Sequence, residues 1–109
     1  KNSPELDHIF PQSILRAKNF DPARINHYAN FWLLAKLKNQ NKSNKHPHDY
    51  FSDVPKSILK EVYIDLEMLD YRQVNTFIKW REREVLSAIK KQLGIKGDEM
   101  DYDDSYWED

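Results

Sequence analysis

The chain has 109 residues and a net charge of −1, and this length predicts a single domain with its own hydrophobic core. It contains no cysteine, which excludes a disulfide framework and a thiolate zinc site and suits a reducing compartment. No apolar run approaches the roughly 20 residues that a membrane span requires, and Lys1-Asn2-Ser3-Pro4 is no signal peptide, so we expect a cytoplasmic protein without membrane contact.

The first expected element is a strand at residues 5–10, which Pro11 should end because proline cannot donate to a sheet ladder. Strict alternation along a strand would place Asp7 and His8 on opposite faces. Both side chains can therefore serve one site only if the strand ends or twists at His8.

A connecting segment should occupy residues 12–28, with a helical turn at 13–16 and another turn at Asp21-Pro22. A second short strand is expected at residues 30–34, followed by a polar helix at 35–44. Three side chains of the connecting segment should anchor it to the core: Phe20, Ile25 and Tyr28.

Two further helices are expected in the second half of the chain. The first should start at 53–55 and bury an apolar stripe made of Ile58, Val62, Leu66 and Leu69. The second should start at a capping box formed by Asp70 and Gln73, run to about Leu93 and stop at Gly94. One face of this second helix should carry Val74, Ile78, Val85 and Ile89.

The predicted fold class is α+β. A small unit of two strands and one helix should occupy residues 1–52, and packed helices over 53–95 should support it within the same domain. Residues 96–109 form an acidic tail of low complexity, a composition that predicts disorder.

The near-zero net charge conceals an asymmetry along the chain. Residues 97–109 contain seven acidic side chains and no Lys or Arg, which leaves 17 basic against 11 acidic residues, or +6, over 1–96. Residues 16–45 contain seven basic side chains against Asp21 alone. Such a stretch is expected of a protein that binds a phosphate backbone, although charge runs are often only solvated surface.

Four polar residues could converge on one point of the expected strand–strand–helix unit. Asp7 and His8 are adjacent and pair a hard oxygen ligand with the one side chain that acts as a base near neutral pH. Asn30 and Asn39 stand nine positions apart, around the second strand and the start of the polar helix. This pattern predicts a metal-dependent nuclease site.

The same residues resemble a known family. Leu6-Asp7-His8-Ile9-Phe10-Pro11-Gln12-Ser13, Asn30-Phe31-Trp32-Leu33-Leu34 and Asn39-x-x-Lys42-Ser43 are similar, in order and spacing, to the HNH (His-Me finger, ββα-metal) endonuclease domain, including that of RNA-guided CRISPR nucleases. Residues 29–50 and the later helical segment with Phe77-Ile78-x-x-Arg81 resemble the C-terminal nuclease domain of GmrSD-type restriction enzymes, which act against phage DNA. Because the chain lacks an initiator Met, we expect a fragment whose upstream domain is missing.

The resemblance implies a role for each residue of the pattern. His8 would be the general base that activates water, and the side-chain amide of Asn30 would orient its imidazole. Asp7 and Asn39 would bind one divalent ion, Mg²⁺ with Mn²⁺ as a substitute. The DNA partner would be contacted by Lys42 and its basic or polar neighbours, Lys38, Ser43 and Lys45.

Each assignment has a structural alternative. Asn30 could cap a turn, and Asn39 could be a solvated helix residue. His27 is expected to be structural, and His46 and His48 to be solvated. The alternative function is a non-cleaving nucleic-acid-binding or regulatory module that has kept the fold.

Overall fold

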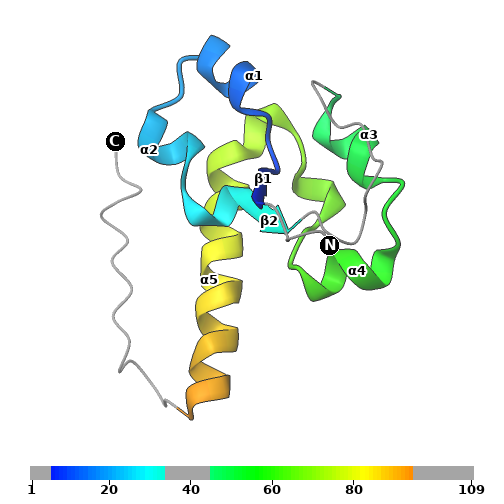
Figure 1. The fold of residues 1–109 in the computed structure, drawn as a ribbon, viewed down its shortest axis with the longest axis vertical. Helices are drawn as coiled ribbons and strands as arrows, with labels where there is room; N and C mark the ends of the chain where they lie inside the picture. The colour runs from blue at the N-terminus through cyan, green and yellow to red at the C-terminus, as the bar shows by residue number, and fades with distance from the viewer. Residues whose placement is uncertain (1–5, 34–44, 95–109) are drawn as a thin grey trace, which may run out of the picture.

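The computed structural model describes residues 6–33 and 45–94, in which two short strands are accompanied by helices (Figure 1). In chain order the elements are β1 (Leu6–His8), α1 (Gln12–Ala17), α2 (Pro22–Ile25), the 3₁₀ turn η1 (Tyr28–Asn30), β2 (Phe31–Leu33), α3 (Pro47–Phe51), α4 (Lys56–Glu61), the 3₁₀ turns η3 (Leu66–Met68) and η4 (Tyr71–Gln73), and α5 (Val74–Leu93). This mixture confirms the α+β character. The polar helix expected at 35–44 and the acidic tail lie outside the described residues.

The two strands pair antiparallel, with Asp7 opposite Trp32 and His8 opposite Phe31. Both lie within the ranges that the sequence predicted. β1 ends at His8, and one further bond in the same register follows it, from the Ile9 amide to the carbonyl oxygen of Asn30 at 2.7 Å. The strand ends at His8, as a shared site at Asp7 and His8 requires, but both residues belong to the paired segment, and their convergence on one site stays a prediction.

The core joins the N-terminal segment to the helices that follow it. Phe10 is fully buried, and its ring lies edge-on to Tyr71 and Phe77, with centroids 5.4 and 5.6 Å away. Trp32 of β2 packs edge-on against Phe51 of α3 at 4.8 Å. Aromatic contacts of this kind hold both ends of the strand pair against helices distant in sequence.

The connecting segment forms α1 and α2, and one of its three expected anchors is wrong. Ile25 is buried and Phe20 is partly buried against the core. Tyr28 instead is 49% exposed and stacks on His27, with ring centroids 4.6 Å apart. Its place in the turn η1 directs the ring along the surface.

The helix expected from residue 53 onward does not extend over the whole predicted apolar stripe, which ran to Leu69. α4 ends at Glu61, and Tyr63 adopts a positive φ of 58°, a conformation that a helix cannot contain. Asp65 then caps η3 by accepting from the Glu67 amide at 2.9 Å. Leu66 and Leu69 therefore pack from a separate turn rather than from the same helix as Ile58.

α5 ends where predicted, since Gly94 has the left-handed φ of 74° that terminates many helices. Its start differs. Asp70 accepts from the Arg72 amide and caps η4, while the Gln73 side chain donates to the Glu67 carbonyl, so no reciprocal capping box forms.

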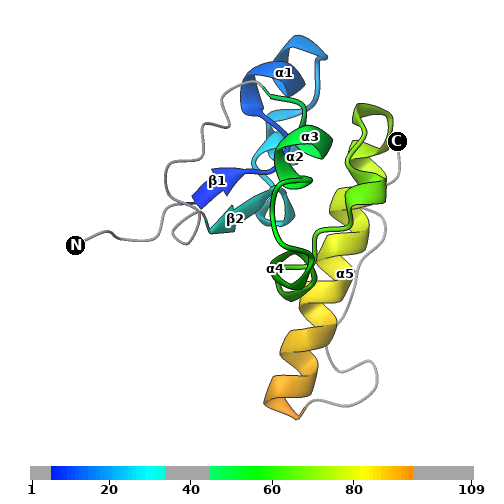
Figure 2. The same cartoon turned by 90° about the vertical axis from the view of Figure 1, so that its right-hand side faces the viewer.

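Only the first half of α5 packs on the body of the molecule (Figure 2). Val74, Phe77 and Ile78 are buried, whereas Ile89 is 40% exposed and Val85 only partly buried, so the predicted stripe loses its cover midway. No helix among the described residues is both long and apolar enough to cross a membrane.

Candidate functional site

His8 occupies the last position of β1, where its ring lies against Phe31 of β2 with centroids 4.3 Å apart. Its Nε2 is 3.0 Å from Oδ1 of Asn26. Because an amide oxygen only accepts hydrogen bonds, Nε2 carries the proton in this arrangement and Nδ1 carries the lone pair. The imidazole is thus held in the tautomer whose Nδ1 can accept a proton.

Asn26 is itself held by the short helix α2. Asp21 caps this helix by accepting from the Ala23 amide at 2.9 Å, and the Asn26 amide donates to the Pro22 carbonyl at 2.9 Å. The Arg24 guanidinium donates to the Asn75 side chain on α5. Four residues alone make a marginal helix, so these contacts are what fix the position of Asn26.

Asn30 is fully buried and ties three main-chain groups together. Its Oδ1 accepts from the Phe10 amide at 2.9 Å, and its Nδ2 donates to the carbonyls of Ile25 at 2.9 Å and Phe10 at 3.3 Å. These bonds direct the amide to the main chain rather than to the imidazole, so the direct contact expected between Asn30 and His8 is made by Asn26. Asn30 instead fixes the main chain at two places: at Phe10, two residues after His8, and at Ile25, the residue before Asn26.

Asp7 is partly buried and faces α3. The phenol of Tyr50, on that helix, is buried, and burial together with the negative charge of Asp7 raises the pKa of Tyr50 to about 12. The carboxylate therefore lies close enough to Tyr50 to disfavour a second negative charge.

The other expected ligand, Asn39, lies outside the described residues, as do the expected DNA contacts Lys38, Lys42 and Ser43. Within 6–33 and 45–94, no group of three or more His, Asp or Glu side chains could hold a metal ion. Lys45 is described and exposed, with its Nζ 3.9 Å from the Asp53 carboxylate.

The His46-Pro47-His48 segment has a structural role. Nδ1 of His46 accepts from the amide of His48 at 3.1 Å, which caps α3 behind Pro47. Both histidine residues are exposed, in line with the sequence expectation.

His27 also caps a helical turn, one residue after Asn26. Its Nδ1 accepts from the Ala29 amide at 3.0 Å, and its Nε2 donates to Glu82 of α5 at 3.2 Å. Burial lowers the pKa of His27 below 6.5, against the opposing effect of Glu82. The neutral ring is therefore the form that the fold selects.

We expect the free energy of unfolding to fall as the pH drops through 6.5, because the unfolded chain then binds a proton more readily than folded His27 does. Urea unfolding at pH 7.5 and pH 5.5 measures the change. His27→Asn keeps a capping side chain without a titrating ring, so its profile should be flatter. An equally steep profile for His27→Asn would assign the pH dependence to other groups.

Arg81 of α5 is a buried polar residue to which the sequence analysis assigned no structural role. It is 7% exposed, and its guanidinium donates only to main-chain carbonyls. Nη1 bonds Ala29 at 2.9 Å and Phe31 at 2.7 Å, while Nε and Nη2 bond Val62 and Tyr63 at 2.9–3.1 Å. Burial lowers the pKa of Arg81 to about 10, so the side chain remains charged at neutral pH. We call these contacts the Arg81 clamp.

The clamp supports the candidate site from behind. Two of its acceptors, Ala29 and Phe31, flank Asn30, and Phe31 carries the ring against which His8 lies. The site is therefore a partly buried imidazole with an oriented tautomer and a main chain locked by Asn30 and Arg81, and the Asp7 carboxylate lies toward Tyr50 of α3. Comparison of the chain with family models, with curated proteins and with solved structures finds no match.

Proposed function

We propose that this chain is a metal-dependent endonuclease of the HNH type, the nuclease part of a larger restriction or phage-defence protein, and that it hydrolyses DNA phosphodiester bonds. The observation that carries the proposal is the imidazole of His8, held through Nε2 by Asn26 and preceded in the chain by Asp7. An ordinary surface histidine needs no partner that selects its tautomer. A general base does, since the proton must be accepted at a defined nitrogen.

In the proposed reaction, Nδ1 of His8 takes a proton from the attacking water. The water oxygen bonds to phosphorus as the bond from phosphorus to the 3′ oxygen breaks. The leaving 3′ oxygen takes a proton from solvent water, which leaves a 5′-phosphate and a 3′-hydroxyl. Asn26 contributes by holding the ring through the reaction, because it accepts from Nε2–H more strongly when the ring becomes positively charged. Asn30 contributes by fixing the main chain on either side of this pair.

The donor set suits a hard divalent cation. Asp7 offers a carboxylate oxygen and Asn39 would offer an amide oxygen, the ligand types that Mg²⁺ and Mn²⁺ prefer and that a thiolate-preferring ion does not. When bound, such an ion offsets negative charge on the phosphate and on the leaving oxygen.

The partner favoured by charge is a nucleic acid. Arg16 and Lys18 of the α1 region are exposed and belong to the basic stretch over 16–45, as does Lys45 at the start of α3. Cationic side chains on the segments around His8 would meet the phosphate backbone and make binding depend on salt.

The test is incubation of the full chain with supercoiled plasmid DNA in Mg²⁺. We expect nicked or linear product, with 3′-hydroxyl ends that a DNA polymerase can extend. Salt-dependent mobility shifts of DNA without any product would instead support the non-cleaving binding module. If the chain neither cleaved nor bound DNA, both functions would be contradicted.

A further inference from the structure

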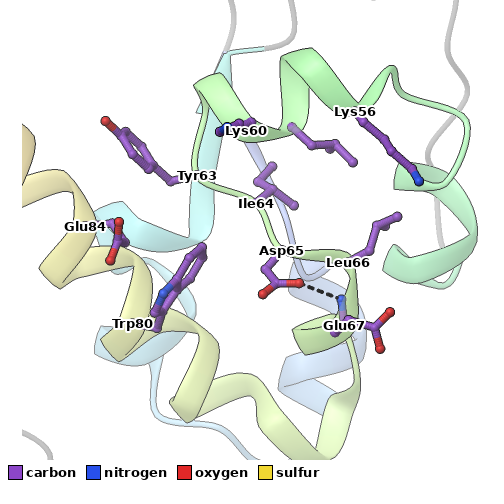
Figure 3. Close-up of a pocket in the computed structure, with 10 residues that line it drawn as sticks. Lys56, Lys60, Tyr63, Ile64, Asp65, Leu66, Glu67, Trp80 and Glu84 are labelled. Carbon is purple, nitrogen blue, oxygen red and sulfur yellow. Dashed lines mark hydrogen bonds between the residues drawn. The ribbon is translucent and has the colours of Figure 1, made fainter.

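A cavity of about 520 Å³ lies between α4, η3 and the middle of α5, away from His8 (Figure 3). Its inner surface is apolar and includes Leu59, Ile64 and the ring of Trp80. Asp65 points into it beside Trp80. An aromatic wall beside a carboxylate suits a ring that carries a hydrogen-bond donor, such as a phenol.

The cavity continues along α5 toward its C-terminal end. A second hollow, of about 410 Å³, is lined by residues of the last three turns, among them Ser87 and Lys91. Tyr63 and Glu84 line both hollows, so the two form one groove that runs from Trp80 to the end of the helix. We call it the α5 groove.

The groove is lined by three lysine residues and by the carboxylates of Asp65, Glu67 and Glu84. Lys56, Lys60 and Lys91 line it and make no ion pair with any other residue in the described ranges. Two of them stand one helical turn apart on α4, above the Trp80 end. A segment with acidic side chains on both sides of an aromatic ring would pair with Lys56 and Lys60 while the ring enters the cavity between them and Trp80.

The chain itself supplies such a segment where the groove ends. Residues 95–109 follow Gly94 directly and contain seven acidic side chains with Tyr102, Tyr106 and Trp107. The left-handed φ of Gly94 ends the helix and turns the chain away from its axis. We propose that residues 95–109 fold back along the α5 groove and place Tyr102 in the cavity beside Trp80.

Chain dimensions select Tyr102 among the three aromatic residues. If residues 94–97 make the reversal, Asp98 starts the return opposite Lys91. An extended chain advances about 3.3 Å per residue, so Tyr102 lies about 13 Å further on. At about 1.5 Å per helical residue this corresponds to nine positions back from Lys91, between Glu84 and Trp80. Tyr106 and Trp107 would pass beyond the cavity.

The chemistry fits the same register. The phenol of Tyr102 would donate to the carboxylate of Asp65, which already accepts from the Glu67 amide through Oδ1. Its acidic neighbours Asp101 and Asp103 would lie near Lys60 and Lys56 at the rim. A tyrosine side chain would therefore pack against the Trp80 ring and also donate to the Asp65 carboxylate. This docking does not depend on nuclease activity.

The experiment is heteronuclear NMR on the full chain at low protein concentration. We expect nuclear Overhauser contacts between the Tyr102 ring and the Trp80 indole, and restricted picosecond–nanosecond motion of residues 98–104. Tyr102→Ala should shift the Trp80 indole N–H resonance and abolish these contacts. Tyr106→Ala, the matched variant four residues further on, should leave that resonance in place.

Three results would overturn the proposal. The first is a Trp80 resonance that does not respond to Tyr102→Ala. The second is fast motion throughout residues 98–104 of the wild-type chain. The third is contacts that strengthen with concentration while the sedimenting mass doubles, which would assign the groove to a second copy of the chain.

Discussion

Replacing His8 with alanine is expected to lower the rate of plasmid cleavage by about 10²–10⁴-fold, the usual cost of deleting a general base. DNA binding should persist, because the variant keeps Asp7 and every basic side chain. The fold should persist as well, since His8 is only partly buried and lies at the end of a strand. Cleavage is measured by gel and binding by filter retention on the same preparations.

His48→Ala is the matched control, because it removes an exposed imidazole from α3 without touching the pair formed by His8 and Asn26. Its cleavage rate should equal that of the wild type. If His8→Ala cleaved as fast as His48→Ala, the mechanism with His8 as the base would be wrong.

Asn26 provides an intermediate arm of the same experiment. Asn26→Ala should cost about 10–100-fold, since it releases the ring without deleting the base. Asn26→Asp keeps an acceptor oxygen toward Nε2 and should restore most of the rate. A purely structural role for Asn26 predicts instead that both variants change stability and cleavage together.

The largest expected effect on stability comes from Arg81→Met. The substitution leaves four main-chain carbonyls without their donor, and each unsatisfied buried acceptor costs about 1–3 kcal/mol. Because these costs are not additive, we expect the free energy of unfolding to fall by about 3–5 kcal/mol. Urea unfolding followed by circular dichroism measures this change.

Arg83→Met, two residues further along α5 and exposed, serves as the control and should change stability by about 0.5 kcal/mol or less. Arg81→Lys should fall between the two variants, because one ammonium cannot reproduce the planar fork that reaches carbonyls on both sides. A loss below about 1 kcal/mol for Arg81→Met would contradict the clamp.

Local signals in the sequence predict much of this fold. Pro11 stands at the N-cap of α1, and Gly94 ends α5, because each acts through its own backbone conformation. The same is true of the capping residue Asp21, which marks the turn now seen as the start of α2. Such residues need no distant partner to act.

The features that sequence reasoning missed depend on contacts far apart in the chain. α4 stops before Tyr63 without a glycine or proline, and the carbonyl of Tyr63 is held by a guanidinium 18 residues further on. Asn26 meets His8 across 18 residues, a contact that no local pattern encodes. Arg81 did carry a signal, since it stands three and four positions after Ile78 and Phe77 and thus on the buried face of α5.

The Arg81 clamp also bears on how the chain could be divided. Its bonds to Ala29 and Phe31 span 52 and 50 residues, so the strand pair relies on a helix from the other end of the described chain. A fragment that stopped after α3 would keep His8, Asn26 and Asn30 yet lose the donors behind β2 and the ring of Phe77 behind Phe10. Grafting residues 6–33 onto another scaffold would therefore require a cation placed as Arg81 is. The candidate site and the helix that supports it therefore form one structural unit.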